Sequence, residues 1–182
     1  KAKGVNFGLA YGAAAPTLAR NLIIALKEAE KLEASAFATY ARLKSWQEEA
    51  ANFMNLNGFT QTAFGTRRHA TDDLFSSDRG LVARMHRRGT NFTIQGTAAE
   101  MLKIVLTKLW TEGVLDLRME FFAPIYDEVV SWVHKDDVQA YCEMMKEIMT
   151  SAKPEKHSIP QVPEISIGYS WGHLHEIGRE PK

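Results

Sequence analysis

The sequence has little cysteine and proline and no long apolar run, so it lacks the features of disulfide-rich, proline-rich and membrane-spanning proteins. It has one cysteine, Cys142, and six prolines among 182 residues. A single cysteine forms no internal disulfide and has no second cysteine with which to frame a zinc site. No apolar run approaches the roughly 20 residues that a membrane-spanning helix needs, and the first residues lack the pattern of a signal peptide. We therefore expect a globular, cytoplasmic protein with no membrane partner.

The chain also lacks an excess of one charge. Its 22 basic residues balance 22 acidic residues, and this balance alone argues against a general binder of polyanions. The positive charges are nevertheless concentrated in the middle of the chain, at residues 67–69 and 84–88. We expect any nucleic-acid face to lie in this central part of the sequence.

Hydrophobic periodicity and turn residues predict an ordered series of helices and strands. Gly12 followed by Pro16 indicates that one helix stops and another starts. The predicted elements are a helix over 1–11, an amphipathic helix from 17, a second helix from about 37 to 56, a hairpin at 59–64, a basic helix over 80–90, a core helix over 98–110, a hairpin over 118–133, a helix that Asp136-Asp137 caps and that reaches 149, and a strand at 162–167.

Three sets of residues have a spacing and composition that suit ligand binding or catalysis. The first is Lys3, Phe7 and Tyr11, which recur every four residues and so line one stripe of the first helix. A cation one turn from an aromatic ring suits a nucleoside triphosphate, with Lys3 on phosphate oxygens and Phe7 stacked on the base or sugar. The alternative is an ordinary helix whose aromatic rings pack in a core.

The second set is Arg87, Asn91 and Gln95, which are again four residues apart. If the helix continues through Asn91, one face presents three long hydrogen-bonding side chains. Such donors can hold correctly paired DNA without reading its sequence, because every base pair offers minor-groove acceptors in nearly equivalent positions. The alternative is a solvated polar face that ends in a helix break.

The third set is Tyr126-Asp127-Glu128, at the tip of the predicted second hairpin. A carboxylate at a hairpin tip is rigidly held yet reachable from solvent, which suits a hard Mg²⁺ ion. Two such ions about 4 Å apart assist an in-line displacement at phosphorus. The alternative is a β-turn in which aspartate serves local hydrogen bonding.

These sets resemble motifs of family A DNA polymerases, the bacterial polymerase I family. Residues 3–12, KGVNFGLAYG, are similar to the second half of motif B, the fingers helix that holds the incoming nucleotide. Residues 87–99, RRGTNFTIQGTAA, are similar to the block that contacts primer and template, and residues 64–68, FGTRR, resemble a fingers segment. The tripeptide at 126–128 resembles motif C, usually His-Asp-Glu, and GYSWG at 168–172 resembles the C-terminal ending of the family.

The resemblance implies an α+β fold, in which a helical fingers region is followed by a palm portion with a β-hairpin and a terminal strand. It assigns residues 1–80 to the fingers, and residues 81–182 to the helices that contact primer-template and the C-terminal part of the palm. Asp127 and Glu128 are the implied catalytic residues, and Asp127 is a ligand of Mg²⁺, with two ions in the complete active site. The implied dNTP-binding residues are Lys3, Phe7 and Tyr11, and the implied DNA-binding residues are Arg67, Arg68, Arg87, Asn91, Gln95 and Tyr126.

Motif A, whose aspartate partners Asp127 in this family, is not found in these 182 residues. We therefore expect the chain to be inactive alone and to need a second polypeptide that carries motif A and the rest of the palm and thumb. It would be a piece of a split polymerase, or a processed or truncated product. Tyr126 in place of the histidine fits a phage enzyme, which would work in the host cytoplasm.

Two other functions compete with a DNA polymerase. A single-subunit RNA polymerase shares the palm and a related fingers helix, but residues 6–8 (Asn-Phe-Gly) and 95–97 (Gln-Gly-Thr) favour the DNA enzyme. A noncatalytic nucleic-acid-binding subunit would keep the fold without the chemistry. Retention of Lys3, Asp127 and Glu128 argues against that second alternative.

Overall fold

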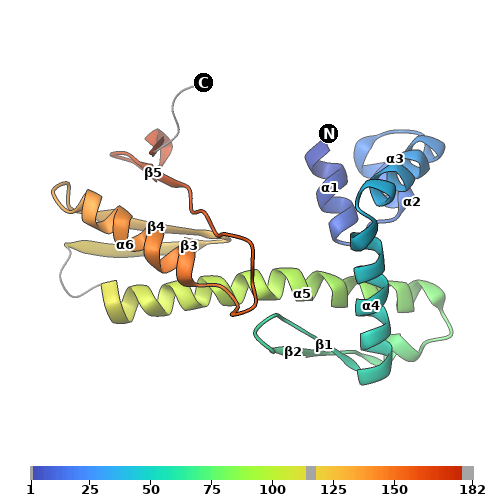
Figure 1. The fold of residues 1–182 in the computed structure, drawn as a ribbon. Helices are drawn as coiled ribbons and strands as arrows, with labels where there is room; N and C mark the ends of the chain where they lie inside the picture. The colour runs from blue at the N-terminus through green and yellow to red at the C-terminus, as the bar shows by residue number, and fades with distance from the viewer. Residues whose placement is uncertain (1, 114–117, 178–182) are drawn as a thin grey trace. The chain divides into compact units, whose positions relative to one another are not determined.

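The computed structural model describes residues 2–113 and 118–177. The chain forms two compact units, Lys1–Thr97 and Ala98–Lys182. Helices and small antiparallel two-stranded sheets both occur among the described residues, which confirms the predicted α+β class (Figure 1). No described helix is both long and apolar enough to cross a membrane. The predicted functional division after residue 80 stays a prediction.

The first unit begins with four helices, α1 (Ala2–Ala10), α2 (Ala15–Leu22), α3 (Leu26–Thr39) and α4 (Ala41–Asn57). The prediction of one uninterrupted helix from 17 to about 36 is wrong, because the chain turns at Ile23, where φ is 56°. Leu18 and Ala29 both pack with Leu9 in one buried cluster. In one straight helix, the eleven residues from Leu18 to Ala29 would span about 16 Å. Because the chain turns at Ile23, α2 and α3 can instead pack their apolar faces against each other.

The next segment is a short hairpin followed by the longest helix. Strands β1 (Phe59–Gln61) and β2 (Arg67–His69) pair antiparallel, and a 3₁₀ turn, η1 (Asp72–Phe75), follows. The hairpin predicted at 59–64 starts where β1 starts, but its second strand lies beyond the predicted range. Helix α5 (Arg79–Lys108) is continuous for 30 residues and contains the division between the two units. The basic helix and the core helix of the sequence prediction are therefore one element, with no break at 95–97.

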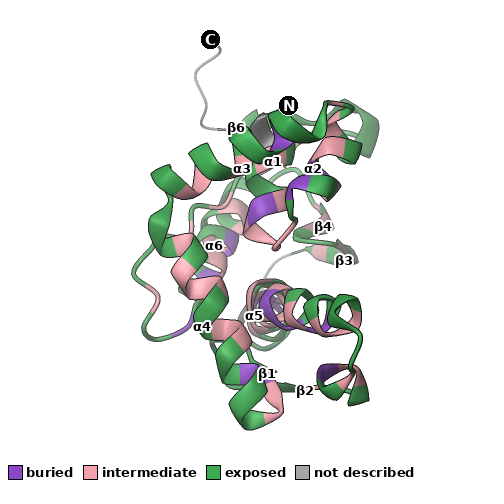
Figure 2. Ribbon diagram, turned by 90° about the vertical axis from the view of Figure 1, so that its right-hand side faces the viewer, coloured by how far each residue is buried: buried purple, intermediate pink, exposed green. Residues whose placement is uncertain are grey.

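The second unit contains the other hairpin and a helix packed beside it. After a π-helical turn, η2 (Leu109–Gly113), come strands β3 (Met119–Ile125) and β4 (Glu128–Val133) and helix α6 (Val138–Ser151). Val105 and Leu109 form a buried cluster with Met145 and Ile148 of α6. Figure 2 marks such buried positions in purple, and they are few compared with the exposed ribbon.

The end of the second unit is a small antiparallel sheet of β5 (Ile165–Ile167) and β6 (His175–Ile177), with a 3₁₀ turn, η3 (Trp171–His173), between the strands. The strand near 162–167 was predicted, whereas β6 was not. Three residues of β6 provide too short a pattern for alternation to be recognised in the sequence.

Candidate functional site

Helix α1 exposes the aromatic stripe that the sequence singled out. Its buried residue is Leu9, which is 2% exposed, whereas Phe7 is 49% exposed. The core face of α1 is therefore not the face of Phe7. The rings of Phe7 and Tyr11 lie 6.1 Å apart between centroids and are tilted by 31°, so they form two adjacent aromatic surfaces on successive turns. The side chain of Lys3 lies outside the described part of the structure.

The end of α1 is held in a defined position. Gly12 has φ of 77°, and Ala13 N–H donates to the carbonyl of Gly8 at 2.8 Å, the closing bond of a Schellman-type helix end. The Gln47 side chain donates to the carbonyl of Leu9 at 2.7 Å. A Cβ added at Gly12 would lie 3.2 Å from Cγ of Arg87, so the turn after α1 closely approaches α5. Tyr11 is thereby fixed beside the basic segment of α5.

A pocket of about 310 Å³ lies between this turn and α5, within the first unit. We call it the arginine pocket. It brings Tyr11 of the first set together with Arg87 and Asn91 of the second, although about 80 residues of sequence separate them. Phe7 and Gln95 do not line it. The residues lining the arginine pocket are Gly8, Tyr11, Ala13, Thr17, Arg84, Arg87, Arg88 and Asn91.

Two of the arginines in this pocket were not predicted as site residues. Arg84 and Arg88 belong to the basic segment that was recognised only as a charge cluster. Their spacing of four residues, combined with Arg87 and Asn91, places all four on one face of a continuous helix. That spacing was a usable signal, because Arg84, Arg87 and Arg88 all lie inside the basic helix that was predicted over 80–90.

Hydrogen bonding in the pocket is incomplete. Arg84 forms an ion pair with Asp73 at 2.8 Å, whereas neither Arg87 nor Arg88 has a polar partner among the described residues. The side-chain oxygen of Asn91 is buried and accepts no hydrogen bond from any described residue. Because this oxygen is buried, the polar groups that the pocket offers to a ligand are the guanidinium groups of Arg87 and Arg88.

The first hairpin holds the other two predicted DNA-binding arginines against aromatic rings. The guanidinium carbon of Arg67 lies 4.4 Å from the ring centroid of Phe59, and that of Arg68 lies 5.7 Å from the centroid of Phe92 on α5. Both arginines remain exposed. Cation–π contacts of this kind orient a guanidinium while leaving its N–H groups free to donate.

The second hairpin presents Asp127 and Glu128 at a tight turn. Ile125 pairs with Glu128, so Tyr126 and Asp127 are the two turn residues. Tyr126 has φ of 56° and is 96% exposed. A positive φ at the first turn position matches the twist that two-residue hairpins require, and it projects the tyrosine into solvent. The side chains of Asp127 and Glu128 form no ion pair or hydrogen bond with any other described residue.

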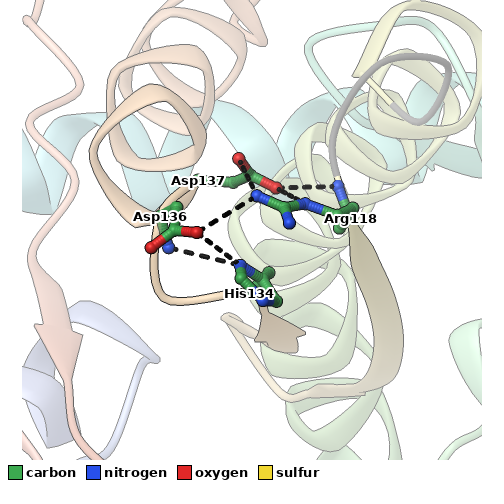
Figure 3. A network of polar contacts seen from close by, with 4 residues as sticks. All are labelled: Arg118, His134, Asp136 and Asp137. Carbon is green, nitrogen blue, oxygen red and sulfur yellow. Dashed lines mark hydrogen bonds and ion pairs between the residues drawn. The ribbon is translucent and has the colours of Figure 1, made fainter.

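An ionic network closes the opposite end of this hairpin, as Figure 3 shows. Arg118, before β3, donates from Nε to the carboxylate of Asp137 at 2.8 Å and from Nη2 at 3.1 Å. These hydrogen bonds lower the pKa of the Asp137 carboxyl. Asp136 lies 3.6 Å from Arg118 and 3.4 Å from His134. The network ties the start of β3 to the residues that precede α6.

The predicted capping of the last helix by Asp136-Asp137 is wrong in its side-chain detail. Asp137 occupies the N-cap position of α6 but makes no side-chain cap hydrogen bond. Its two oxygens instead accept from the guanidinium of Arg118. A charged, bidentate donor is a stronger partner than a backbone N–H. The carboxylate therefore bonds to Arg118 at the start of the hairpin and not to the backbone of α6.

Comparison with known proteins identifies the family. A family model described as DNA polymerase family A matches residues 1–173. The chain belongs to DNA polymerase family A. Among curated family A proteins, it is 32% identical to "DNA polymerase I, thermostable" of Thermus filiformis over 93% of the chain, and 32% identical to DNA polymerase I of Pseudomonas aeruginosa over 96%.

A solved structure supports the same family A assignment. It is described as the POL domain of Pol1 from M. smegmatis in complex with DNA primer-template and dNTP, and it matches with a TM-score of 0.75 and 28% identity. The match covers 84% of this chain and 27% of that chain. The chain spans about a fifth of the length of the curated relatives that it matches.

Proposed function

We propose that these residues form the fingers and part of the palm of a template-directed DNA polymerase. They would bind the incoming dNTP and the primer-template and supply one half of a two-metal site for nucleotidyl transfer. The observation that carries the proposal is the arginine pocket, because it joins Tyr11 of the nucleotide-binding stripe to Arg87 and Asn91 of the DNA-binding stripe in one compact unit.

Nucleotide binding is assigned to the exposed stripe of α1. The half-exposed ring of Phe7 offers a flat surface to a base or sugar, and Tyr11 continues that surface toward α5. Lys3, one turn earlier, would meet the phosphates. A cation beside stacked rings recognises the two chemically different halves of a nucleotide at once.

Primer-template binding is assigned to donors that form no hydrogen bond or ion pair with another described residue. Arg87 and Gln95 are exposed on one face of α5, with Asn91 between them. Donors at this spacing can follow the minor groove, where acceptors recur at every base pair. Arg67 and Arg68, oriented by Phe59 and Phe92, would contact phosphates, and Tyr126 would lie near the primer end.

Asp127 and Glu128 fit half of a magnesium site. Their carboxylates are hard oxygen donors at an exposed, rigid turn, and no other described group competes for them. No cluster of three or more potential metal-ligating side chains occurs among the described residues. When bound, a pair of Mg²⁺ ions would stabilise the charge that develops on the reacting oxygens. The partner carboxylate in this proposal is the motif A aspartate.

The remaining parts of the proposal follow from that incomplete site. The chain alone would not synthesise DNA, and the motif A aspartate, with the rest of the palm and thumb, would be supplied by further polypeptide. The proposed protein is a phage enzyme that works in the cytoplasm of its host.

Primer extension tests this function. We expect residues 1–182 alone to give no synthesis, and an assembly that also contains motif A to extend a primer with dNTPs in preference to rNTPs. In that assembly, Asp127→Asn should abolish extension while leaving primer-template binding nearly unchanged. Asp72→Asn, the same change at an exposed position of η1, is the matched control and should keep full activity.

Three results would contradict the proposal. Robust synthesis by the 182-residue chain alone would show that the metal site is complete without motif A. Preference for rNTPs would favour an RNA polymerase. Unchanged synthesis by the Asp127→Asn assembly would favour a noncatalytic role for this hairpin.

A further inference from the structure

We infer that the arginine pocket binds a phosphate group of the DNA backbone through Arg84 and Arg88. Arg84 lies outside the family motifs, and Arg88 lies inside the block 87–99 but is not among the residues to which a contact is assigned. The inference rests on the proposed function and extends its DNA-binding surface. The ligand class is a nucleotide unit of a polynucleotide, recognised by its phosphate.

The geometry of α5 gathers the required groups. Arg84 and Arg88 are one helical turn apart, and Arg87 and Asn91 share their face. Three guanidinium groups therefore reach one pocket from one rigid helix. Thr17 of α2 and Tyr11, after α1, face them from the other wall and add two hydroxyl groups. Guanidinium groups match phosphate oxygens with paired N–H donors.

The charge in the pocket favours an anion. None of the described residues that line it is acidic, and the carboxylate of Asp73 pairs with Arg84. Arg87 and Arg88 have no polar partner among residues 2–113 and 118–177. Like charges held close together repel one another, so a bound phosphate would relieve that repulsion.

The volume of the pocket indicates the size of the ligand. The volume of about 310 Å³ lies at the lower end of the roughly 300–1,000 Å³ of ligand sites, which suits one nucleotide unit.

Two sources could supply the phosphate, namely the DNA backbone and the triphosphate of the incoming nucleotide. The lining residues favour the backbone. Arg84 and Arg88 share their helix face with Arg87 and Asn91, which are assigned to primer-template. Of the residues assigned to the nucleotide, Tyr11 lines the pocket and Phe7 does not.

The test is the salt dependence of primer-template binding, measured with the complete protein that contains these residues. We expect Arg88→Gln to weaken binding about tenfold at low salt and to reduce the slope of log K against log salt by about 0.9, the value for one lost phosphate contact. Arg84→Gln should act in the same direction. Arg88→Lys, which keeps the charge, should keep the slope.

Arg79→Gln is the matched control, because it removes one arginine from the same helix outside the pocket. It should leave the slope at the wild-type value. Equal slopes for Arg88→Gln, Arg79→Gln and the wild type would overturn the inference while leaving the proposed function intact. A raised KM for dNTP with unchanged DNA binding would assign the phosphate to the nucleotide and overturn the backbone assignment. Failure of the wild type to bind primer-template would instead overturn the proposed function.

Discussion

The close approach of α5 to the first hairpin leads to a specific prediction for Gly96. A Cβ added at this position would lie 2.8 Å from Cγ2 of Thr62 and 3.1 Å from the ring of Phe92. Thr62 is buried, and its hydroxyl accepts a hydrogen bond from the N–H of Thr66. Its side chain is therefore poorly able to move, and Gly96→Ala should push the hairpin away from α5.

The size of the effect follows from opposing contributions. Overpacking a well-packed contact costs about 1–3 kcal/mol, and replacing glycine by alanine inside a helix returns about 1 kcal/mol. Displacement of the hairpin also strains the hydrogen bond from Ala63 N–H to the hydroxyl of Thr97, now 2.9 Å long, which adds about 1 kcal/mol. We expect Gly96→Ala to lower the free energy of unfolding by about 1–3 kcal/mol, because the last two contributions cancel.

Gly89 on the same helix is the matched control. A Cβ there would meet Cε of Met54 at 2.7 Å, and a flexible methionine end can turn aside more easily than a threonine methyl. Gly89→Ala should therefore stay within about 0.5 kcal/mol of the wild type because the helix gain offsets the rearrangement. Denaturant unfolding of both variants provides the measurement.

A second change separates the steric explanation from other causes. Thr62→Ser removes the crowded methyl group but keeps the hydroxyl that Thr66 uses. It should cost about 0.8 kcal/mol in the wild type and nothing in the Gly96→Ala variant. If Thr62→Ser costs the same in both backgrounds, or if Gly96→Ala is as stable as the wild type, the reasoning is refuted.

Two further predictions concern other parts of the chain. Tyr141→Phe should cost about 1 kcal/mol of stability, because the Tyr141 hydroxyl donates to Ser131 at 2.7 Å; in a Ser131→Ala background the same change should cost little, and an equal loss in both would contradict the pairing. Partial burial lowers the pKa of His86 below its ordinary value of about 6.5. The contribution of His86 to the free energy of unfolding should be fully present above pH 6.5 and should fall as the pH decreases below it. The reason is that the unfolded state takes up the proton at a higher pH than the folded state does. Unfolding measured between about pH 7.5 and 5 checks this, and His86→Gln should show a shallower dependence; identical pH profiles would contradict it.

Elements with a strong local pattern could be predicted from the sequence. Gly58 ends α4 in the left-handed conformation, and two apolar strands flank Asp127 as expected. The spacing of Tyr11 and of Arg87 also indicated their helix faces. These signals act over about four residues of helix or two of strand, so the sequence contains them without any knowledge of packing.

Sequence patterns gave wrong predictions where two local conformations or two hydrogen-bond partners were nearly equally favourable. The run of helix-forming residues around Ile23 continues smoothly in composition, yet the chain turns there so that Leu18 and Ala29 share a core. Asp137 was expected to cap a helix because aspartate does so in general. Its carboxylate instead binds Arg118, 19 residues earlier in the chain.

The sequence by itself determined the family motifs, the presence of a hairpin on each side of α5, and the polar stripe on α5. Only the tertiary structure decided that Tyr11 lies beside Arg87, and that Arg84 and Arg88 line the same pocket. The physical reason is the range of the interactions. Periodicity and capping are set by residues within one or two turns, whereas the arginine pocket depends on packing between segments about 80 residues apart, which no local pattern specifies.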